Sequence, residues 1–363
     1  MKTYNFSPGP AMVPEPVHQR IQEDWFNWQN SNIPVIEIGH RTDDFLALME
    51  KTEQNLRHLL NIPANYNILF LQGGARGQFA LVPMNLLGKN HQADYLVYGL
   101  WSEQACLEAQ KYGDINRINI LQSTDQLGIT DQSEWSLNAN AAYLHYCSNE
   151  TISGMCLKNL PKSDSPLVAD MSSDILSKPI DVSQFGLIYA CFQKNLGIAG
   201  LTLIILRDNL LNQSIIETPS VFNYCNQCHE HSLYNTLPTF SYYVMSLIIE
   251  WMQQEGGITA IALRNQEKAD MLYRIIDHYG DFYLNSIDPL YRSLMNVTFS
   301  LKNKNMERQF LLEAEQHGLL YLKGHPSFGG LRASIYNAMP IEGVAALATF
   351  MRIFAEKNTT SYF

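Results

Sequence analysis

The chain reads LIYACFQK at residues 187–194, an apolar run that ends in a lysine. A second run, LVAD at residues 167–170, ends in an aspartate. Short apolar runs of this kind predict buried strands. Ligands of open α/β sheets bind beyond the carboxyl ends of the strands, so Asp170 and Lys194 are expected to face one crevice.

Further apolar runs surround these two and alternate with helical patterns. We expect buried strands at residues 68–71, 95–98, 141–145, 167–169, 187–190 and 201–206. Apolar residues recur every three to four positions in the stretches expected to be helices, which are residues 17–28, 45–59 and 241–254. Strands separated by helices predict a mostly parallel sheet covered on both faces.

A smaller α/β layer is expected after Gly256-Gly257, a natural helix stop. Its expected elements are helix 262–278, strand 296–301, helix 305–317, strands 319–322 and 331–336, and helix 341–355. The sequence thus predicts an α/β protein of two domains. The large one spans residues 15–258, the small C-terminal one spans 259–363, and an N-terminal segment, residues 1–14, joins them.

Composition narrows the classes of function. The chain has 363 residues, 25 basic and 35 acidic side chains, and a formal charge of -10, which disfavours nucleic acid or an anionic membrane as a partner. No secretory signal and no apolar run of about 20 residues is visible, so we expect a cytoplasmic protein. The six cysteines are then expected to be reduced thiols.

The stretch QGGARG at residues 72–77 follows a predicted strand and leads into a predicted helix. Small residues at a helix N-terminus let backbone N–H groups close on an anion, so a phosphate fits here. The spacing matches neither of the two standard nucleotide-binding fingerprints. A tight strand-to-helix turn without a ligand remains the alternative.

The pair Asp170 and Lys194 also has two interpretations. Desolvation disfavours the ammonium form of a buried lysine, and a neutral amine can form a Schiff base. The alternative is a structural ion pair, or a lysine on the rim. A phosphate cradle, a strand-end carboxylate and a strand-end amine together match what pyridoxal 5'-phosphate requires: a phosphate anchor, a partner for its ring nitrogen and an amine for its aldehyde.

Over essentially its whole length the sequence resembles the phosphoserine aminotransferase family, which belongs to the class-V, fold-type I pyridoxal-phosphate enzymes. The resemblance implies a large domain with a mostly parallel, seven-stranded type of sheet and a smaller C-terminal α/β domain. The matching stretches, in order, are residues 5–11, 40–41, 73–79, 145–151, 169–173, 193–195, 235–236, 324–325 and 329–337.

The resemblance implies cofactor contacts. Lys194 would bind the cofactor's aldehyde, and Asp170 would hold its ring nitrogen protonated. Trp101 would stack on the ring, for which the alternative is an ordinary core tryptophan, and Thr151 would bind the ring hydroxyl. The phosphate would be held by Ala75, Arg76 and Gln193, and by Asn235 and Thr236 of the partner subunit. The resemblance thus implies a homodimer with shared active sites.

The resemblance also implies substrate contacts. Arg332 would clamp the amino acid's α-carboxylate, a task that suits its planar fork. The distal anionic group would be met by further positive groups, namely His40, Arg41, Arg76 and His325. The implied reaction moves the amino group between glutamate and 3-phosphohydroxypyruvate, giving O-phosphoserine and 2-oxoglutarate in serine biosynthesis. A phosphorylated four-carbon oxo acid of pyridoxine biosynthesis is implied as a second substrate.

This chain departs from the family pattern at one position. The family commonly has an arginine after His325, where this chain has Pro326, so one phosphate contact is missing unless Lys323 or Arg41 replaces it.

Two rival functions are also considered. A cysteine desulfurase or an alanine–glyoxylate type transaminase shares the aspartate and the lysine. Cys225-Asn226-Gln227-Cys228-His229 spells the haem attachment pattern, although we expect no metal and interpret these residues as a loop of free thiols.

Overall fold

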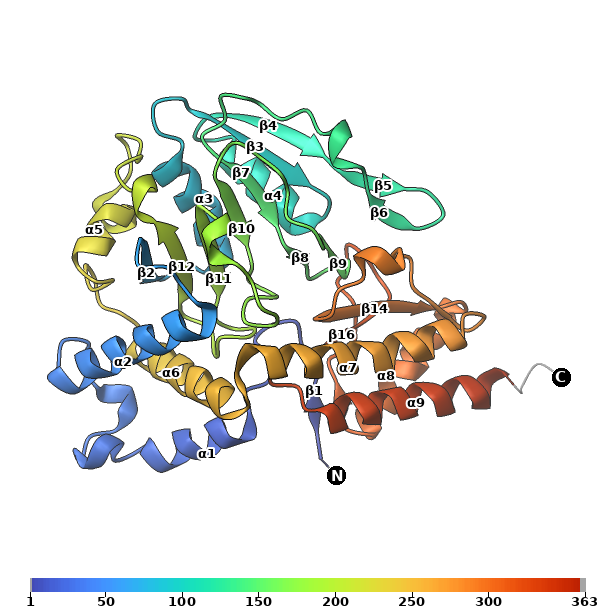
Figure 1. The fold of residues 1–363 in the computed structure, drawn as a ribbon. Coiled ribbons are helices and arrows are strands. Elements are labelled where there is room, and N and C mark those ends of the chain that lie inside the picture. The colour runs from blue at the N-terminus through green and yellow to red at the C-terminus, as the bar shows by residue number, and fades with distance from the viewer. Residues whose placement is uncertain (1, 360–363) are drawn as a thin grey trace.

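The computed structural model describes residues 2–359, and its centre is a seven-stranded sheet (Figure 1). The strands lie in the order β2 (Tyr66–Leu71), β12 (Thr202–Arg207), β11 (Leu187–Cys191), β10 (Leu167–Asp170), β7 (Leu144–Cys147), β3 (Gln92–Val97) and β4 (Asp114–Asn119). Only β12 runs antiparallel to its neighbours. The prediction of a mostly parallel sheet is confirmed.

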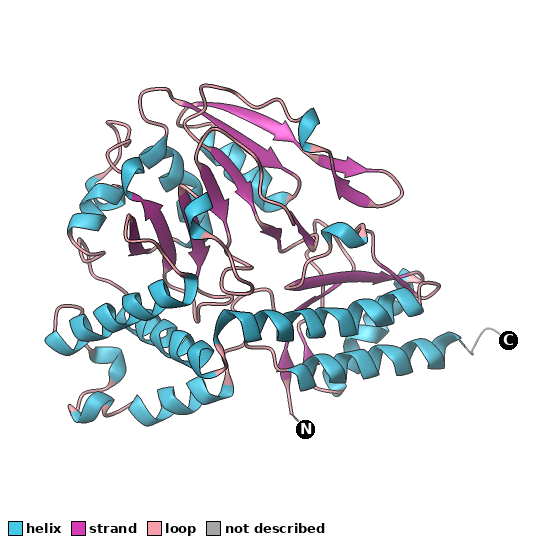
Figure 2. Cartoon of the chain, in the orientation of Figure 1, coloured by secondary structure: helices cyan, strands magenta, loops and turns pink. Residues whose placement is uncertain are grey.

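Helices cover both faces of this sheet, as Figure 2 shows. Alternate residues of β2 point to opposite faces, so Ile68 belongs to one core and Leu69 to the other. The core that contains Ile68 is completed by α1 (Glu15–Asp24), α2 (Asp43–Leu60) and α6 (Thr239–Gln254). The core that contains Leu69 is completed by α3 (Gly74–Leu86) and α4 (Leu100–Ala109).

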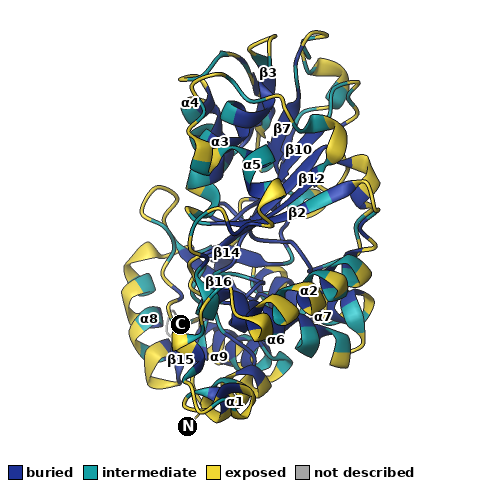
Figure 3. Ribbon diagram, turned by 90° about the vertical axis from the view of Figure 1, so that its left-hand side faces the viewer, coloured by how far each residue is buried: buried dark blue, intermediate teal, exposed yellow. Residues whose placement is uncertain are grey.

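A second, antiparallel sheet has a core of its own. Its buried segments lie in the lower half of Figure 3. Its strands are β13 (Tyr283–Leu284), β14 (Asn296–Leu301) and β16 (Leu331–Ser334). The helices of this core are α7 (Gly257–His278), α8 (Glu307–Gln316) and α9 (Ile341–Thr359). The proposed boundary at residues 258/259 falls in the first turn of α7, and the division into two domains stays a prediction.

The N-terminal segment runs from the smaller core to the turn that carries Lys194. Strand β1 (Tyr4–Asn5) pairs with β15 (Leu319–Leu320), and Phe6 is buried in the smaller core. Further along, the Ala11 N–H donates to the Gln193 carbonyl at 2.9 Å. Two distant parts of the chain therefore meet beside the predicted site.

Several expected boundaries are wrong. The helix expected over residues 17–28 ends at Asp24, and Trp28 begins a 3-10 turn (Trp28–Asn30) in which Gln29 and Asn30 adopt φ of 51° and 59°. The strand expected at 319–322 is β15, outside the smaller sheet. Apart from short 3-10 turns, the remaining elements of the described residues are two hairpins and one short helix: β5 (Leu121–Ser123) with β6 (Leu127–Ile129), β8 (Asn149–Glu150) with β9 (Met155–Cys156), and α5 (Tyr224–His229).

No helix within residues 2–359 has the length and apolar character needed to cross a membrane.

Candidate active site

The two residues singled out from the strand ends share one cavity. Asp170 is the last residue of β10, and Lys194 lies just beyond the end of β11. Both line a cavity of about 260 Å³. Its other lining residues are Gly73, Gly74, Ala75, Arg76, Trp101, Cys147, Asn149, Thr151, Ser172, Ser173, Cys191 and Gln193. Five of them carry expected cofactor contacts: Ala75, Arg76, Trp101, Thr151 and Gln193.

Lys194 is half-buried, and its Nζ donates a hydrogen bond to Thr151 Oγ1 at 2.8 Å. Among residues 2–359, no carboxylate lies within ion-pairing distance of this amine, so the structural Asp170–Lys194 ion pair is not found. Burial lowers the pKa of Lys194, but neighbouring acidic groups, chiefly Tyr336 and Cys191, raise it, and the net pKa is above the ordinary value. The expectation that desolvation makes this amine shed its proton is therefore wrong.

Asp170 is buried and lines the same cavity. Burial raises the pKa of its carboxyl group above the ordinary value, although hydrogen bonding from Ser172 and the positive charge of Lys194 offset part of this rise. The Ser172 N–H donates to Asp170 Oδ1 at 2.9 Å. A cationic N–H placed against this carboxylate would offset the remaining cost of burial.

The glycine-rich stretch forms the N-terminus of α3. Gly73 caps the helix with φ of 105°, a conformation that favours glycine, and a Cβ there would lie 3.3 Å from the Gly77 Cα. The helix begins at Gly74, so Ala75 and Arg76 belong to its first turn rather than to a loop. Backbone N–H groups of a first helical turn lack partners within the helix and suit an anion.

Trp101 is held by a residue that the sequence did not reveal. The N–H groups of Trp101 and Ser102 donate to the Glu150 carboxylate at 3.0 and 2.8 Å. This buried carboxylate thus satisfies the N-terminus of α4, which begins at Leu100, and fixes the position of Trp101. The Arg76 guanidinium lies over the Trp101 ring, 5.5 Å from its centroid.

Two buried N–H groups beside the cavity have no hydrogen-bond partner among the described residues. They are Arg332 Nε and Trp101 Nε1. Arg332, on β16, is 5% exposed and donates through Nη1 to the Thr151 carbonyl at 3.3 Å. Burial lowers the pKa of this guanidinium. Because buried donors are almost always paired, these orphans indicate that an acceptor-rich ligand belongs here.

The residues of the cavity therefore fit pyridoxal 5'-phosphate. They offer an amine, a buried carboxylate, a flat aromatic ring and a helix N-terminus, which correspond to the aldehyde, ring nitrogen, ring face and phosphate. Arg332 and its unpaired Nε remain for a substrate carboxylate.

The other predicted residues do not line this cavity. Arg41 Nη2 donates to the Leu233 carbonyl at 2.8 Å. Gln72, just before the glycines, bonds both Asn235 and the Thr236 carbonyl, at 3.3 and 2.9 Å. His325 Nδ1 lies 2.7 Å from the Ser327 hydroxyl. His40 is half-buried outside the cavity.

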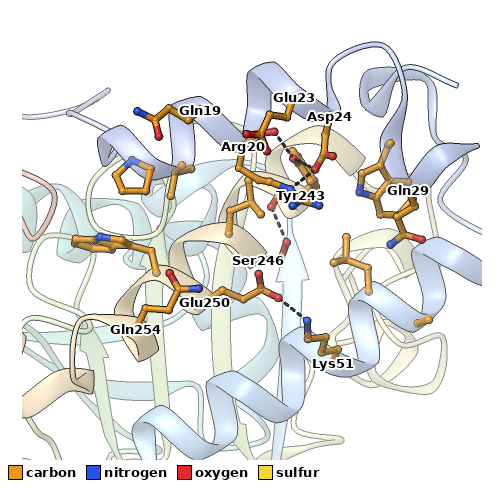
Figure 4. Close-up of a pocket in the computed structure, with 17 residues that line it drawn as sticks. Gln19, Arg20, Glu23, Asp24, Gln29, Lys51, Tyr243, Ser246, Glu250 and Gln254 are labelled. Carbon is orange, nitrogen blue, oxygen red and sulfur yellow. Dashed lines mark hydrogen bonds and ion pairs between the residues drawn. The ribbon is translucent and has the colours of Figure 1, made fainter. Parts of the chain in front are cut away.

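A larger cavity, of about 610 Å³, lies between α1, α2 and α6 (Figure 4). Both of its basic side chains are paired: Lys51 with Glu250 at 2.6 Å, and Arg20 with Asp24 at 2.8 Å. The Tyr243 hydroxyl also donates to Asp24, at 2.7 Å. None of the predicted site residues lines this cavity.

In the part of the chain that the structure describes, the cysteine-containing motif does not form a second functional site. The haem-like pattern lies on α5, where Cys225 Sγ is 3.9 Å from His229 Nε2 and Cys228 Sγ donates to Asn67. Within residues 2–359 no three His, Cys, Asp or Glu side chains are placed to hold a metal ion. The thiols in the active cavity, Cys147 and Cys191, are buried in strands with pKa values raised by burial, unlike the mobile thiolate of a desulfurase.

Comparison with known proteins agrees with this geometry. The family model "Aminotransferase class-V" matches residues 3–347. A phosphoserine aminotransferase of Acinetobacter baylyi is 51% identical over 99% of this chain and 100% of its own length, and one of Laribacter hongkongensis is 49% identical over 99% and 100%. The solved structure of a phosphoserine aminotransferase from Trichomonas vaginalis with bound pyridoxal phosphate superposes with a TM-score of 0.92 at 38% identity, covering 97% of this chain and 100% of that one.

Proposed function

The chain belongs to the class-V aminotransferase family, and on that premise we propose that it acts as a phosphoserine aminotransferase dependent on pyridoxal 5'-phosphate. It would transfer the amino group between glutamate and 3-phosphohydroxypyruvate in serine biosynthesis. The observation that carries the proposal is the single cavity that joins Lys194, Asp170 and Trp101 next to the unpaired Arg332.

Lys194 and Asp170 would contact the reactive groups of the cofactor. When bound, the cofactor supplies an electrophilic aldehyde and a ring that stores the electron pair released at the substrate Cα. Lys194 Nζ would hold the aldehyde and, once freed by the substrate, would carry a proton from the substrate Cα as general base. Thr151 Oγ1, already bonded to this amine, keeps it within reach. Asp170 would keep the ring nitrogen protonated.

The remaining cavity residues would orient the cofactor. Trp101, anchored by Glu150, would stack on its ring. The first turn of α3, with Ala75 and Arg76, would bind the phosphate together with Gln193. Arg332 would bind the α-carboxylate of the amino acid through its planar fork.

We further propose a homodimer with shared active sites. Asn235, Thr236, His40 and Arg41 lie outside the cavity of their own chain, which supports their acting in that of a partner copy. Mixing two inactive variants tests this: Lys194→Ala and the double variant Asn235→Ala, Thr236→Ala. Exchange of subunits should restore activity, because one site of the mixed dimer is intact. Exchange without recovery would contradict shared sites.

The phosphate specificity is tested with glutamate as donor. We expect 3-phosphohydroxypyruvate to be a far better acceptor than unphosphorylated hydroxypyruvate, because the substrate phosphate would meet Arg41, Arg76 and His325. Preference for the unphosphorylated acid would contradict the proposed activity and leave the cofactor assignment standing.

Two narrower proposals accompany the main one. The phosphorylated four-carbon oxo acid of pyridoxine biosynthesis would be a second substrate, since it offers the same phosphate and oxo-acid groups. The protein would work in the cytoplasm, and its six free thiols support a reducing compartment.

A further inference from the structure

The smaller sheet has one apolar and one polar face, and both are buried. Along β14 and β16, alternate side chains point to opposite faces. Val297 and Ala333, which lie opposite each other, belong to the core of the smaller sheet. The other face carries polar side chains that are each at most 5% exposed: Asn296, Thr298, Arg332 and Ser334. A polar face buried in this way needs hydrogen-bond partners.

The hairpin of β8 and β9, residues 149–156, lies against this polar face (Figure 1). Hydrogen bonds join the two: Asn149 Nδ2 to Asn296 Oδ1 at 2.8 Å, Arg332 Nη1 to the Thr151 carbonyl at 3.3 Å, and Thr298 Oγ1 to the Ser153 carbonyl at 2.7 Å. The Thr151 hydroxyl in turn accepts from Lys194 Nζ. The hairpin therefore connects the amine of Lys194 with the strand that carries Arg332.

Asn296 lies at the centre of these contacts, which orient its amide group. Its Nδ2 donates to Ser334 Oγ at 3.0 Å and to the Tyr336 hydroxyl at 3.2 Å. The Tyr336 hydroxyl donates its one hydrogen to the Pro8 carbonyl at 2.8 Å, so towards Asn296 it can only accept. The Nδ2 group of Asn296 must therefore face Tyr336, and its Oδ1 faces Asn149. Because Asn296 is 0% exposed, solvent does not compete for these bonds.

The backbone of the hairpin packs directly against Asn296. Gly154 adopts φ of 78°, and a Cβ there would lie 2.7 Å from the Asn296 carbonyl oxygen and 2.8 Å from Thr298 Oγ1. On the side of the main sheet, Asn149 Nδ2 donates to Ser173 Oγ at 2.8 Å, in the turn that follows β10. The hairpin is thus bonded to the main sheet, and Asn296 bonds the smaller sheet to the hairpin.

We propose that Asn296 is a positioning residue for the substrate, because it holds the strand of Arg332 in place relative to Lys194 so that Arg332 can bind the α-carboxylate of the amino acid. This inference rests on the proposed function, because it takes the roles of Lys194 and Arg332 from there. The hairpin keeps its bond to Ser173 when Asn296 is removed. Loss of Asn296 should therefore weaken substrate binding and leave cofactor binding unchanged.

The binding of glutarate to the full-length protein loaded with pyridoxal phosphate tests this by isothermal titration calorimetry. Glutarate has the chain length of glutamate but no amino group, so it can occupy the substrate site without reacting. Asn296→Ala should bind glutarate about tenfold more weakly, because buried hydrogen-bonding groups lose their partner and Arg332 is no longer held. Thr298→Val removes only the bond to the Ser153 carbonyl and should lose about threefold. The affinity of both variants for pyridoxal phosphate, measured by equilibrium dialysis of the apoprotein, should equal that of the wild type.

Asn85→Ala is the matched control. Asn85 is a buried amide in the last turn of α3, and its Nδ2 donates to the carbonyls of Leu81 and Phe222 at 2.9 and 2.8 Å. It does not line the active cavity. This variant should lose stability to chemical denaturation as Asn296→Ala does, while its affinities for glutarate and for the cofactor stay at the wild-type values.

Steady-state kinetics give a second readout that a merely structural role would not move. Asn296→Ala should raise KM for glutamate about tenfold and change kcat far less, because the lost contact serves binding rather than proton transfer. Wild-type glutarate affinity in Asn296→Ala, or an equal loss in Asn85→Ala, would contradict the positioning role. A loss of cofactor affinity as large as the loss of glutarate affinity would contradict it as well. If the wild type itself fails to bind the cofactor at Lys194, it is the proposed function that fails.

Discussion

The two cavities compared above differ in how their charges are satisfied, not only in size. In the larger one, between α1, α2 and α6, Lys51 and Arg20 are each paired with a carboxylate. In the smaller one, Lys194 has no such pair, and beside it Arg332 Nε has no partner among the described residues. A buried donor without a partner is costly, and a ligand removes the cost. The unpaired Arg332 Nε beside the smaller cavity, together with the amine and carboxylate that line it, therefore favours this cavity over the larger one as the site.

The largest expected effect is the difference in rate between a variant of Lys194 and a variant of Lys51. Lys194→Ala should lower the rate of transamination by at least about a thousandfold, because the general base and the cofactor's covalent partner are lost together. Lys51→Ala, in the larger cavity, removes only an exposed ion pair and should leave the rate unchanged. Steady-state kinetics on both variants decide this. Equal losses would remove the distinction between the cavities.

Arg332, beside the smaller cavity, and Arg20, in the larger one, give a second comparison of the two cavities. Arg332→Lys keeps the charge but loses the planar fork, so KM for glutamate should rise about tenfold or more. Arg20→Lys, the matched change in the larger cavity, should leave KM unaltered. An unchanged KM in Arg332→Lys would mean that the unpaired Nε does not serve the substrate carboxylate.

His145 is a buried imidazole, and the pH dependence of the free energy of unfolding tests whether it is neutral in the folded protein. Its pKa of about 3 lies below the value of about 6.5 expected in the unfolded chain, so only the unfolded chain takes up a proton as the pH falls through 6.5. Stability is therefore lost on acidification. Between pH 6.5 and 5 the wild-type apoprotein should lose roughly 1.5 to 2 kcal/mol more free energy of unfolding than His145→Gln. Parallel pH profiles in chemical denaturation would contradict a neutral His145.

The smallest effect concerns the departure at Pro326. Pro326→Arg should lower KM for 3-phosphohydroxypyruvate a few-fold, because the added contact is charge-assisted but exposed to solvent. KM for glutamate is the internal control and should change less. An unchanged KM for the phosphorylated acid would indicate that Lys323 or Arg41 already supplies the contact.

Local patterns predicted the sheet and the meeting of Asp170 with Lys194, because apolar runs mark buried strands and parallel strands end at one edge. They did not reveal that β12 is antiparallel, although residues 192–201 form a link too short for a crossover helix. Its apolar run looks the same in either direction.

The features of the site that the sequence did not predict depend on contacts between residues far apart in the chain. The contact between Glu150 and Trp101 joins residues 49 positions apart and leaves no local signal. The upward shift in the pKa of Lys194 depends largely on Tyr336, which follows β16 in the smaller sheet. Trp101, Thr151 and Arg332 were proposed from family resemblance, because no spacing in the sequence connects them with Lys194.

The account depends on a covalent bond between Lys194 and the cofactor. Cofactor-saturated protein treated with borohydride, digested and weighed by mass spectrometry should carry a reduced pyridoxyl group on the peptide that contains Lys194. That peptide recovered unmodified from saturated protein would contradict the assignment of the site.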